Sequence, residues 1–94
     1  EWNRPMMGSE LEQMATTMGL ADSEAVIPAI AALFARIGIP PTLAKLGLAE
    51  EQLDWVAEQS CSIERLIQNN PRPLDRSDMR KLLDAAFTGD ASLL

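Results

Sequence analysis

Apolar residues recur along this chain at the spacing i, i+3, i+4, i+7, which places them on one face of a helix. No segment alternates between apolar and polar residues with a period of two, and no internal repeat is visible. Alanine, leucine, methionine and glutamate are plentiful whereas tyrosine is absent, a bias that favours helix over sheet. The pattern therefore predicts an all-α chain.

Capping residues and glycines divide the apolar stripes into four main helices plus short helical turns. The stripes are Leu11, Met14, Ala15 and Met18; Ile27, Ile30, Ala31 and Phe34; Leu53, Val56 and Ala57; and Met79, Leu82, Leu83 and Ala86. The expected N-caps are Ser9, Asp22 or Ser23, Thr42, Ser62 and Asp75, and the expected stops are Gly19, Gly38, Gly47 and Gly89. Pro28 lies several residues past its cap, so we expect a kink or a loosened first turn there.

The length of 94 residues fits a single helical domain or subdomain, residues 1–94, with a loose tail over residues 90–94. A net charge of −6 argues against nucleic acid as a partner. The longest apolar run, residues 25–35, is far shorter than the roughly 20 residues of a membrane span, so no membrane association is expected. A single cysteine and no visible export signal favour the cytoplasm.

The search for catalytic groups is mostly negative. Histidine is absent, so the chain has no imidazole base and no histidine metal ligand, and Cys61 alone cannot form a thiolate site. Four carboxylates could suggest an acidic site, but their spacing is better explained as the solvent-exposed face of one helix: Glu50, Glu51, Asp54 and Glu58. We therefore assign no catalytic, cofactor-binding or metal-binding residue to this chain.

Three groups of residues leave alternatives open. The locally basic cluster is interpreted as a solvated face, with an anion site as the alternative: Arg65, Arg72, Arg76, Arg80 and Lys81. Met14 and Met18 are expected in the core. Trp2 and Trp55 lie outside the stripes and either cover a partner or pack at the edge of the core.

The stretch QNNPRPLD, residues 68–75, holds Arg72 between two prolines. Pro71 and Pro73 are expected to keep Arg72 extended, and Asp75 to cap the last helix. Arg72 is expected to satisfy nearby carbonyl groups or a carboxylate instead of touching a substrate.

Three phrases together resemble the C-terminal part of the iron-containing (group III) alcohol dehydrogenase family, which includes glycerol dehydrogenase-like and maleylacetate reductase-like enzymes. They are EWNRP, LFARIGIPPTLAKLGLAEEQLDWVAEQS and NNPRPLDRSDMRKLLDAAF. The resemblance runs from Trp2 to Phe87. It implies that the chain is the last part of a dehydroquinate synthase-like helical domain, and a fragment of a longer two-domain enzyme.

The resemblance implies a parent enzyme with a Rossmann-like half that binds NAD or NADP. Its helical half would hold a divalent metal, iron or zinc, on one aspartate and three histidines, and the parent would interconvert alcohols with aldehydes or ketones. Those ligands would lie upstream of Glu1, so this chain alone would be inactive and would bind neither metal nor nucleotide. The resemblance places one segment near the substrate cleft: Leu66, Ile67, Gln68 and Asn69.

Two partner classes follow. A fragment would pack against its own missing Rossmann-like half and upstream helices, or self-associate through exposed apolar surface. The alternative hypothesis is an independent acidic helical module that binds a partner protein through its N-terminal methionines and its tryptophans. Such a module should stay monomeric.

Overall fold

The computed structural model describes residues 1–94, apart from the side chain of Leu66, and every described element is helical. Four main helices and one short helix follow one another: α1 Gly8–Met18, α2 Val26–Ile37, α3 Leu53–Ser62, α4 Glu64–Gln68 and α5 Arg76–Thr88. Single 3₁₀ turns stand at Arg4–Met6, Ser23–Ala25, Glu50–Gln52 and Ala91–Leu93. The predicted all-α class, with four main helices and short turns, is confirmed.

Three helices end where the glycines predicted. Gly19, Gly38 and Gly89 follow α1, α2 and α5 with φ of 71°, 81° and 84°, the left-handed conformation that other residues rarely adopt. At Gly89 the space is also restricted, because a Cβ there would lie 3.1 Å from Thr42 Cγ2. This glycine therefore ends α5 and admits the loop that crosses beside it.

The aspartate caps are confirmed, and two serine caps are wrong. The Asp22 carboxylate accepts from the Ala25 N–H, and the Asp75 carboxylate accepts from the Asp78 N–H at 2.9 Å. Ser9 lies inside the first turn of α1, with its hydroxyl on the carboxylate of Glu10. Ser62 is the last residue of α3, and its hydroxyl donates back to the carbonyl of Gln59. Both serines thus bond locally instead of capping a following helix.

Pro28 loosens the helix start as predicted. Ser23–Ala25 forms a 3₁₀ turn, and the α-helical pattern of α2 begins only at Val26. Pro28 is then the third residue of α2, within the first turn, where backbone N–H groups have no helical acceptor. The missing N–H of proline therefore costs the helix no hydrogen bond.

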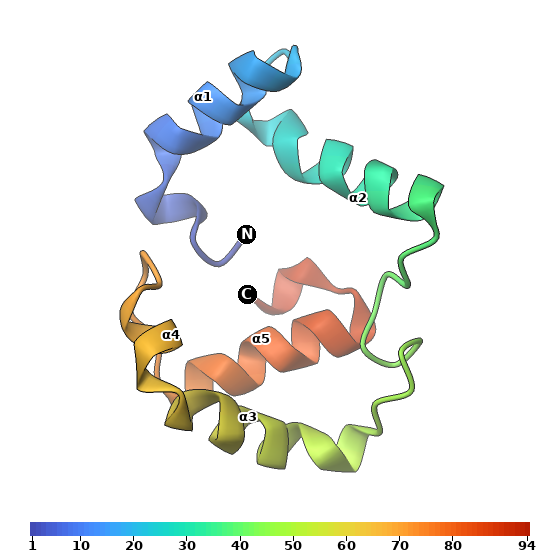
Figure 1. Cartoon of the computed structure of the whole chain (residues 1–94), viewed down its shortest axis with the longest axis vertical. Coiled ribbons are helices and arrows are strands. Elements are labelled where there is room, and N and C mark those ends of the chain that lie inside the picture. Colours follow the sequence, from blue (N-terminus) through green and yellow to red (C-terminus); the bar gives the residue numbers. More distant parts are fainter.

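The helices form two pairs. α1 packs on α2 and α3 packs on α5, and the segment 38–49 runs between the pairs along one side of the molecule (Figure 1). This segment is attached to α5, because the Leu43 N–H donates to the carbonyl of Ala86 at 2.9 Å. The Cα radius of gyration is 14.5 Å, against about 12 Å for a compact domain of this length. The arrangement is therefore open.

Each helical pair has its own small core. Leu11, Ala15 and Val26 are buried together between α1 and α2. On the other pair the buried residues are Leu53 and Ala57 of α3 and Ala85 of α5. The stripe of α3 thus faces inward as predicted, with Leu53 only 1% exposed.

The predicted core position of Met14 and Met18 is wrong. Their side chains are 40% and 44% exposed, although both lie on the apolar stripe of α1. The stripe of α2 behaves similarly, since Ala31 and Phe34 are exposed as well. The sequence identified the apolar faces correctly, but no described element of this chain covers them.

No single described helix is both long and apolar enough to cross a membrane. The segments Gly8–Met18 and Ser23–Ile37 meet the length and composition criteria only as a pair, and they are bent by 78° with respect to each other.

Candidate cleft segment and N-terminal clasp

The segment predicted to line a substrate cleft falls on α4 and the residue that follows it. Ile67 is half-buried, Gln68 and Asn69 are exposed, and the side chain of Leu66 lies outside the described part of the structure. The Asn70 N–H donates to the carbonyl of Ile67 at 3.1 Å and so closes the end of α4. This segment therefore forms a short surface helix that joins α3 to the connector before α5.

The connector is joined to the first residues of the chain by a reciprocal pair of amides. Asn3 Nδ2 donates to Asn70 Oδ1 at 2.8 Å, and Asn70 Nδ2 donates to Asn3 Oδ1 at 2.9 Å. Asn70 Nδ2 also donates to the carbonyl of Arg72. Asn70 thus links the N-terminus and the connector through its side chain, and the end of α4 through its backbone N–H.

Arg72 reinforces the same junction. Its guanidinium carbon lies 3.7 Å from the centroid of the Trp2 ring, and its Nη1 donates to the Trp2 carbonyl at 3.2 Å. Both contacts are partly buried, where a cation over an indole face is attracted more strongly than in open solvent. The prediction that Arg72 satisfies a carbonyl is therefore confirmed. We call Trp2, Asn3, Asn70 and Arg72 the clasp.

The two tryptophans have opposite environments. Trp2 is only 7% exposed, and its indole N–H has no hydrogen-bond partner among the described residues. Trp55 is 63% exposed on the outer side of α3. Trp2 therefore packs inside the clasp and does not contribute to an exposed binding surface, whereas Trp55 does lie outside the core as predicted.

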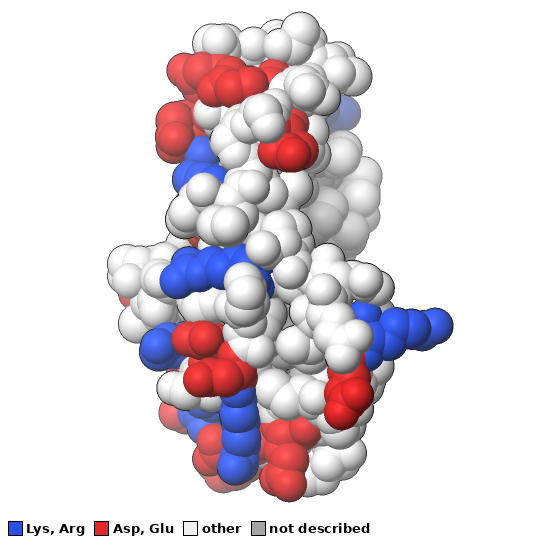
Figure 2. Space-filling model, turned by 90° about the vertical axis from the view of Figure 1, so that its left-hand side faces the viewer, with Lys and Arg blue, Asp and Glu red and all other residues white. Residues whose placement is uncertain are grey.

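The remaining cations of the basic cluster that have described partners are held by carboxylates. Arg80 contacts Asp54 at 2.7 Å and Asp84 at 3.0 Å, and these hydrogen bonds raise the pKa of the Arg80 guanidinium. Arg76 lies 3.7 Å from Glu58. On the face at the left of Figure 1, acidic and basic side chains lie next to one another (Figure 2). These pairings support a solvated, ion-paired face over an anion site.

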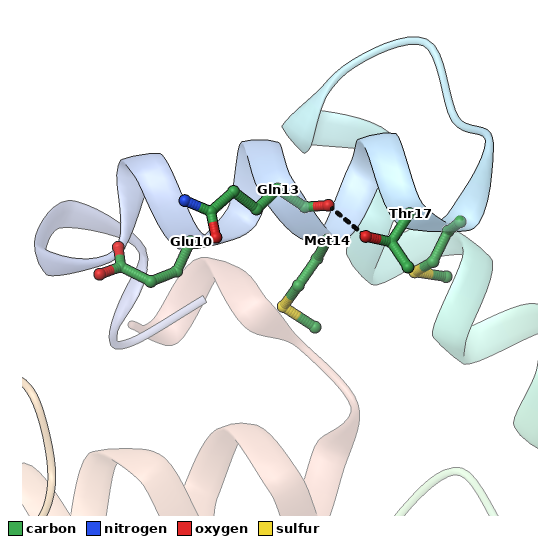
Figure 3. Close-up of a pocket in the computed structure, with 5 residues that line it drawn as sticks. Glu10, Gln13, Met14 and Thr17 are labelled. Atoms are coloured by element: carbon green, nitrogen blue, oxygen red, sulfur yellow. Dashed lines mark hydrogen bonds between the residues drawn. The ribbon is translucent and has the colours of Figure 1, made fainter.

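The apolar surface left open by the fold includes three hollows. The first, of about 470 Å³, lies along α1 and is lined in part by Met14, whose side chain extends below the helix in the view of Figure 3. The second, of about 280 Å³, lies beside α5 and is lined in part by Glu1, Ala85 and Leu94. The third, of about 160 Å³, lies beside the end of α2 and includes Phe34 and Ile39. None of the three is lined by Ile67, Gln68 or Asn69.

The described residues contain no group of three or more aspartate, glutamate, cysteine or histidine side chains that could hold a metal ion. Asp54 of α3 and Asp84 of α5 are instead paired with Arg80. The clasp was not predicted from the sequence as a unit, although the signal for it was present. The phrases EWNRP and NNPRP contain its four residues.

The comparisons with known proteins agree with one another. The model of one protein family, described as "Fe-containing alcohol dehydrogenase family, C-terminal", matches residues 1–87. The curated protein "Long-chain-alcohol dehydrogenase 1" of Geobacillus thermodenitrificans (strain NG80-2) is 36% identical over 55 residues. That match covers 58% of this chain and 14% of the relative. No solved structure matches significantly.

Proposed function

This chain belongs to the Fe-containing alcohol dehydrogenase family, as a C-terminal portion, and on that premise we propose that it is the helical wall of a larger dehydrogenase. The whole protein would interconvert an alcohol with an aldehyde or ketone, using a divalent metal and NAD or NADP. The relative in Geobacillus is named for long-chain alcohols, which supports an alcohol as the substrate class. By itself, this chain would be inactive.

The residues of this chain do not fit a resident iron site. Iron and zinc are held in such enzymes by imidazole and carboxylate groups that converge on one point. Histidine is absent from the sequence, and the described acidic residues do not form a group of three that could hold a metal. We therefore propose that the metal and the nicotinamide are bound by the rest of the parent protein, and we assign neither to this chain.

The observation that carries this proposal is the uncovered face of α2. The helix is well formed and ends at a left-handed glycine, yet Leu33, Phe34 and Ile37 on it are 45%, 44% and 62% exposed. Exposed apolar area of this kind marks a surface that packs against another protein part. We propose that the missing upstream helices and the Rossmann-like half cover it. The prediction of a cytoplasmic location stays a prediction.

The cleft wall is the second part of the proposal. Gln68 and Asn69 present exposed amides at the end of α4, where they can donate to and accept from a hydroxyl or carbonyl oxygen. Ile67 is half-buried beside them and would supply an apolar contact. We propose that these three residues shape the substrate end of the parent's cleft without taking part in hydride transfer.

A titration tests the absence of cofactor binding. Calorimetry of the purified chain with Fe²⁺, Zn²⁺ and NADH in turn should give no saturable heat for any of them. Tight binding at one equivalent of metal or NADH would overturn the proposal, because the chemistry would then belong to this chain.

Sedimentation at several protein concentrations tests the role of α2. We expect the isolated chain to self-associate, and the exchange Ile37→Ser to shift the equilibrium toward monomer. Leu46→Ser is the matched control, since Leu46 is 63% exposed but lies outside α2. A chain that stays monomeric at all concentrations would instead favour an independent interaction module.

A further inference from the structure

The contacts of the clasp bear on the position of the proposed cleft wall. Only the assignment of that wall rests on the proposed function. We propose that Asn70 and Arg72 are positioning residues. Through Asn3 and Trp2 they hold the end of α4, and therefore Gln68 and Asn69, in a fixed place relative to the chain that enters at the N-terminus. The shape of the wall is then set by this junction and not by α4 alone.

Asn70 connects the N-terminal segment to the end of α4. Its side chain exchanges two hydrogen bonds with Asn3, and its backbone N–H bonds to the last turn of α4. The two asparagines are 67 positions apart in sequence. Because each amide both donates and accepts, only one relative orientation of the two side chains satisfies the pair. A shift of Asn3 therefore moves the residue that ends α4.

Arg72 fixes the second point of the junction. The described ion pairs of Arg76 and Arg80 are with carboxylates, whereas the described partner of the Arg72 guanidinium is Trp2, through both its ring and its carbonyl. Two contacts on one residue restrain the guanidinium in rotation as well as in distance. Together, Asn70 and Arg72 give the N-terminal segment two anchor points that are two residues apart. Two such contacts prevent the N-terminal segment from rotating about either one.

Helix α4 depends on this junction. It has only five residues, and neither of its flanking residues provides a side-chain cap. Helices this short are not stable from their backbone bonds alone. The residues on its C-terminal side, Asn70 and Arg72, are bonded to Asn3 and Trp2. The clasp is therefore the described element best placed to hold α4 in position.

The test uses the whole 94-residue chain with Trp55→Phe as the background, so that Trp2 is the only indole. Asn70→Ala should raise the hydrogen-exchange rates of the α4 amides about tenfold, because the three hydrogen bonds of the Asn70 side chain are lost. The control is Asn69→Ala, an adjacent asparagine that shows none of these bonds with described residues. Equal exchange in both variants would overturn the proposal.

Arg72 supplies a second readout that a general loss of packing would not mimic. Arg72→Gln should move the Trp2 emission to longer wavelength and speed exchange in α4. Arg72→Lys should restore most of both signals, because the cation over the ring is retained. If Asn70→Ala lowers the far-ultraviolet helix signal, that variant has lost helix generally. The comparison of Arg72→Gln with Arg72→Lys then tests the positioning role. Identical behaviour of the Gln and Lys variants would refute the role of the cation.

The same exchanges in the whole dehydrogenase separate this inference from the proposed function. Asn70→Ala and Arg72→Gln should raise KM severalfold with little change in kcat, as expected for a misplaced wall. Gln68→Ala and Asn69→Ala test the cleft wall separately. If they leave KM unchanged while the hydrogen-exchange rates in α4 still respond to Asn70→Ala, the assignment of the cleft wall is refuted and the positioning role of the clasp is supported. If the hydrogen-exchange rates of the α4 amides do not respond to Asn70→Ala, the positioning role of the clasp is refuted, whatever the values of KM and kcat.

Discussion

Leu53→Ala should remove a large share of the stability of the α3–α5 pair. Leu53 is 1% exposed and is one of the two largest fully buried side chains in the described structure. The other buried residues of α3 and α5 are alanines, whose side chains are too short to fill the space that Leu53 would leave. Leucine-to-alanine exchanges in cores cost about 2 to 5 kcal/mol, with the lower values where the site can collapse.

The openness of this fold places the expected cost near the lower end of that range. α3 is packed on one side only and its outer side carries the exposed Trp55, so α3 can move toward α5. We expect a loss of about 3 kcal/mol, which for a domain of this size corresponds to a fall in Tm of about 12 to 24 °C. A domain of this length has a stability of roughly 5 to 14 kcal/mol, so the loss is a considerable part of the whole.

Circular dichroism at 222 nm, followed during thermal and urea unfolding, measures this loss. Leu46→Ala is the matched control, because the same atoms are removed from a side chain that is 63% exposed. It should cost less than about 0.5 kcal/mol. If the two variants lose similar stability, or if Leu53→Ala loses less than about 1 kcal/mol, then Leu53 is not the centre of a packed core and the reasoning fails.

Three further predictions concern single positions. Gly89→Ala should destabilise the chain by about 1 to 2 kcal/mol in urea unfolding, because φ is +84° and the new Cβ meets Thr42; an unchanged midpoint would contradict this. Asp75→Ala should cost about 1 kcal/mol through loss of the cap of α5, seen as faster exchange of the first-turn amides. Hydrogen bonds from Ser92, first from its side chain, lower the pKa of Asp90 below 3.8. The contribution of Asp90 to the tail turn is therefore present above that pH and lost as the pH falls through the lowered pKa; NMR titration of a Ser92→Ala variant should show the pKa return upward.

The parts of the fold that could be predicted from sequence are those decided within a few residues. Gly19 and Gly89 stop their helices, and Asp75 caps α5, because each depends on backbone atoms of its own turn. Ser9 and Ser62 show the limit of this reasoning. A serine hydroxyl can bond to several nearby groups, and in both cases it bonds to a residue one or three positions away.

The wrong prediction that Met14 and Met18 are buried has a different cause. An apolar stripe shows which face of a helix avoids water, but it does not show whether the same chain supplies the cover. Met14 and Met18 lie on such a stripe and are exposed, because α2 covers Leu11 and Ala15 only. An apolar stripe therefore predicts burial correctly only where a neighbouring element packs against it.

The clasp could not be predicted as a unit because its contacts join residues 67 and 70 positions apart. The phrases EWNRP and NNPRP contain the four residues, but a local pattern does not show which of them pair. The burial of Trp2 follows from them, since a tryptophan outside every stripe is covered here by an arginine 70 positions later in the sequence.

Glu1 and Leu94 both line the hollow beside α5, and the two ends of the chain lie near each other (Figure 1). A short glycine-rich linker can therefore join them, and new ends can be opened at Gly47, in an exposed turn far from the clasp. In such a circular permutant the clasp would lie in the interior of the chain, with Asn70 about 30 residues upstream of Asn3 when a short linker is included. Closing the clasp would then span fewer residues than the 67 that separate the two asparagines now, which lowers the entropy cost of closing it.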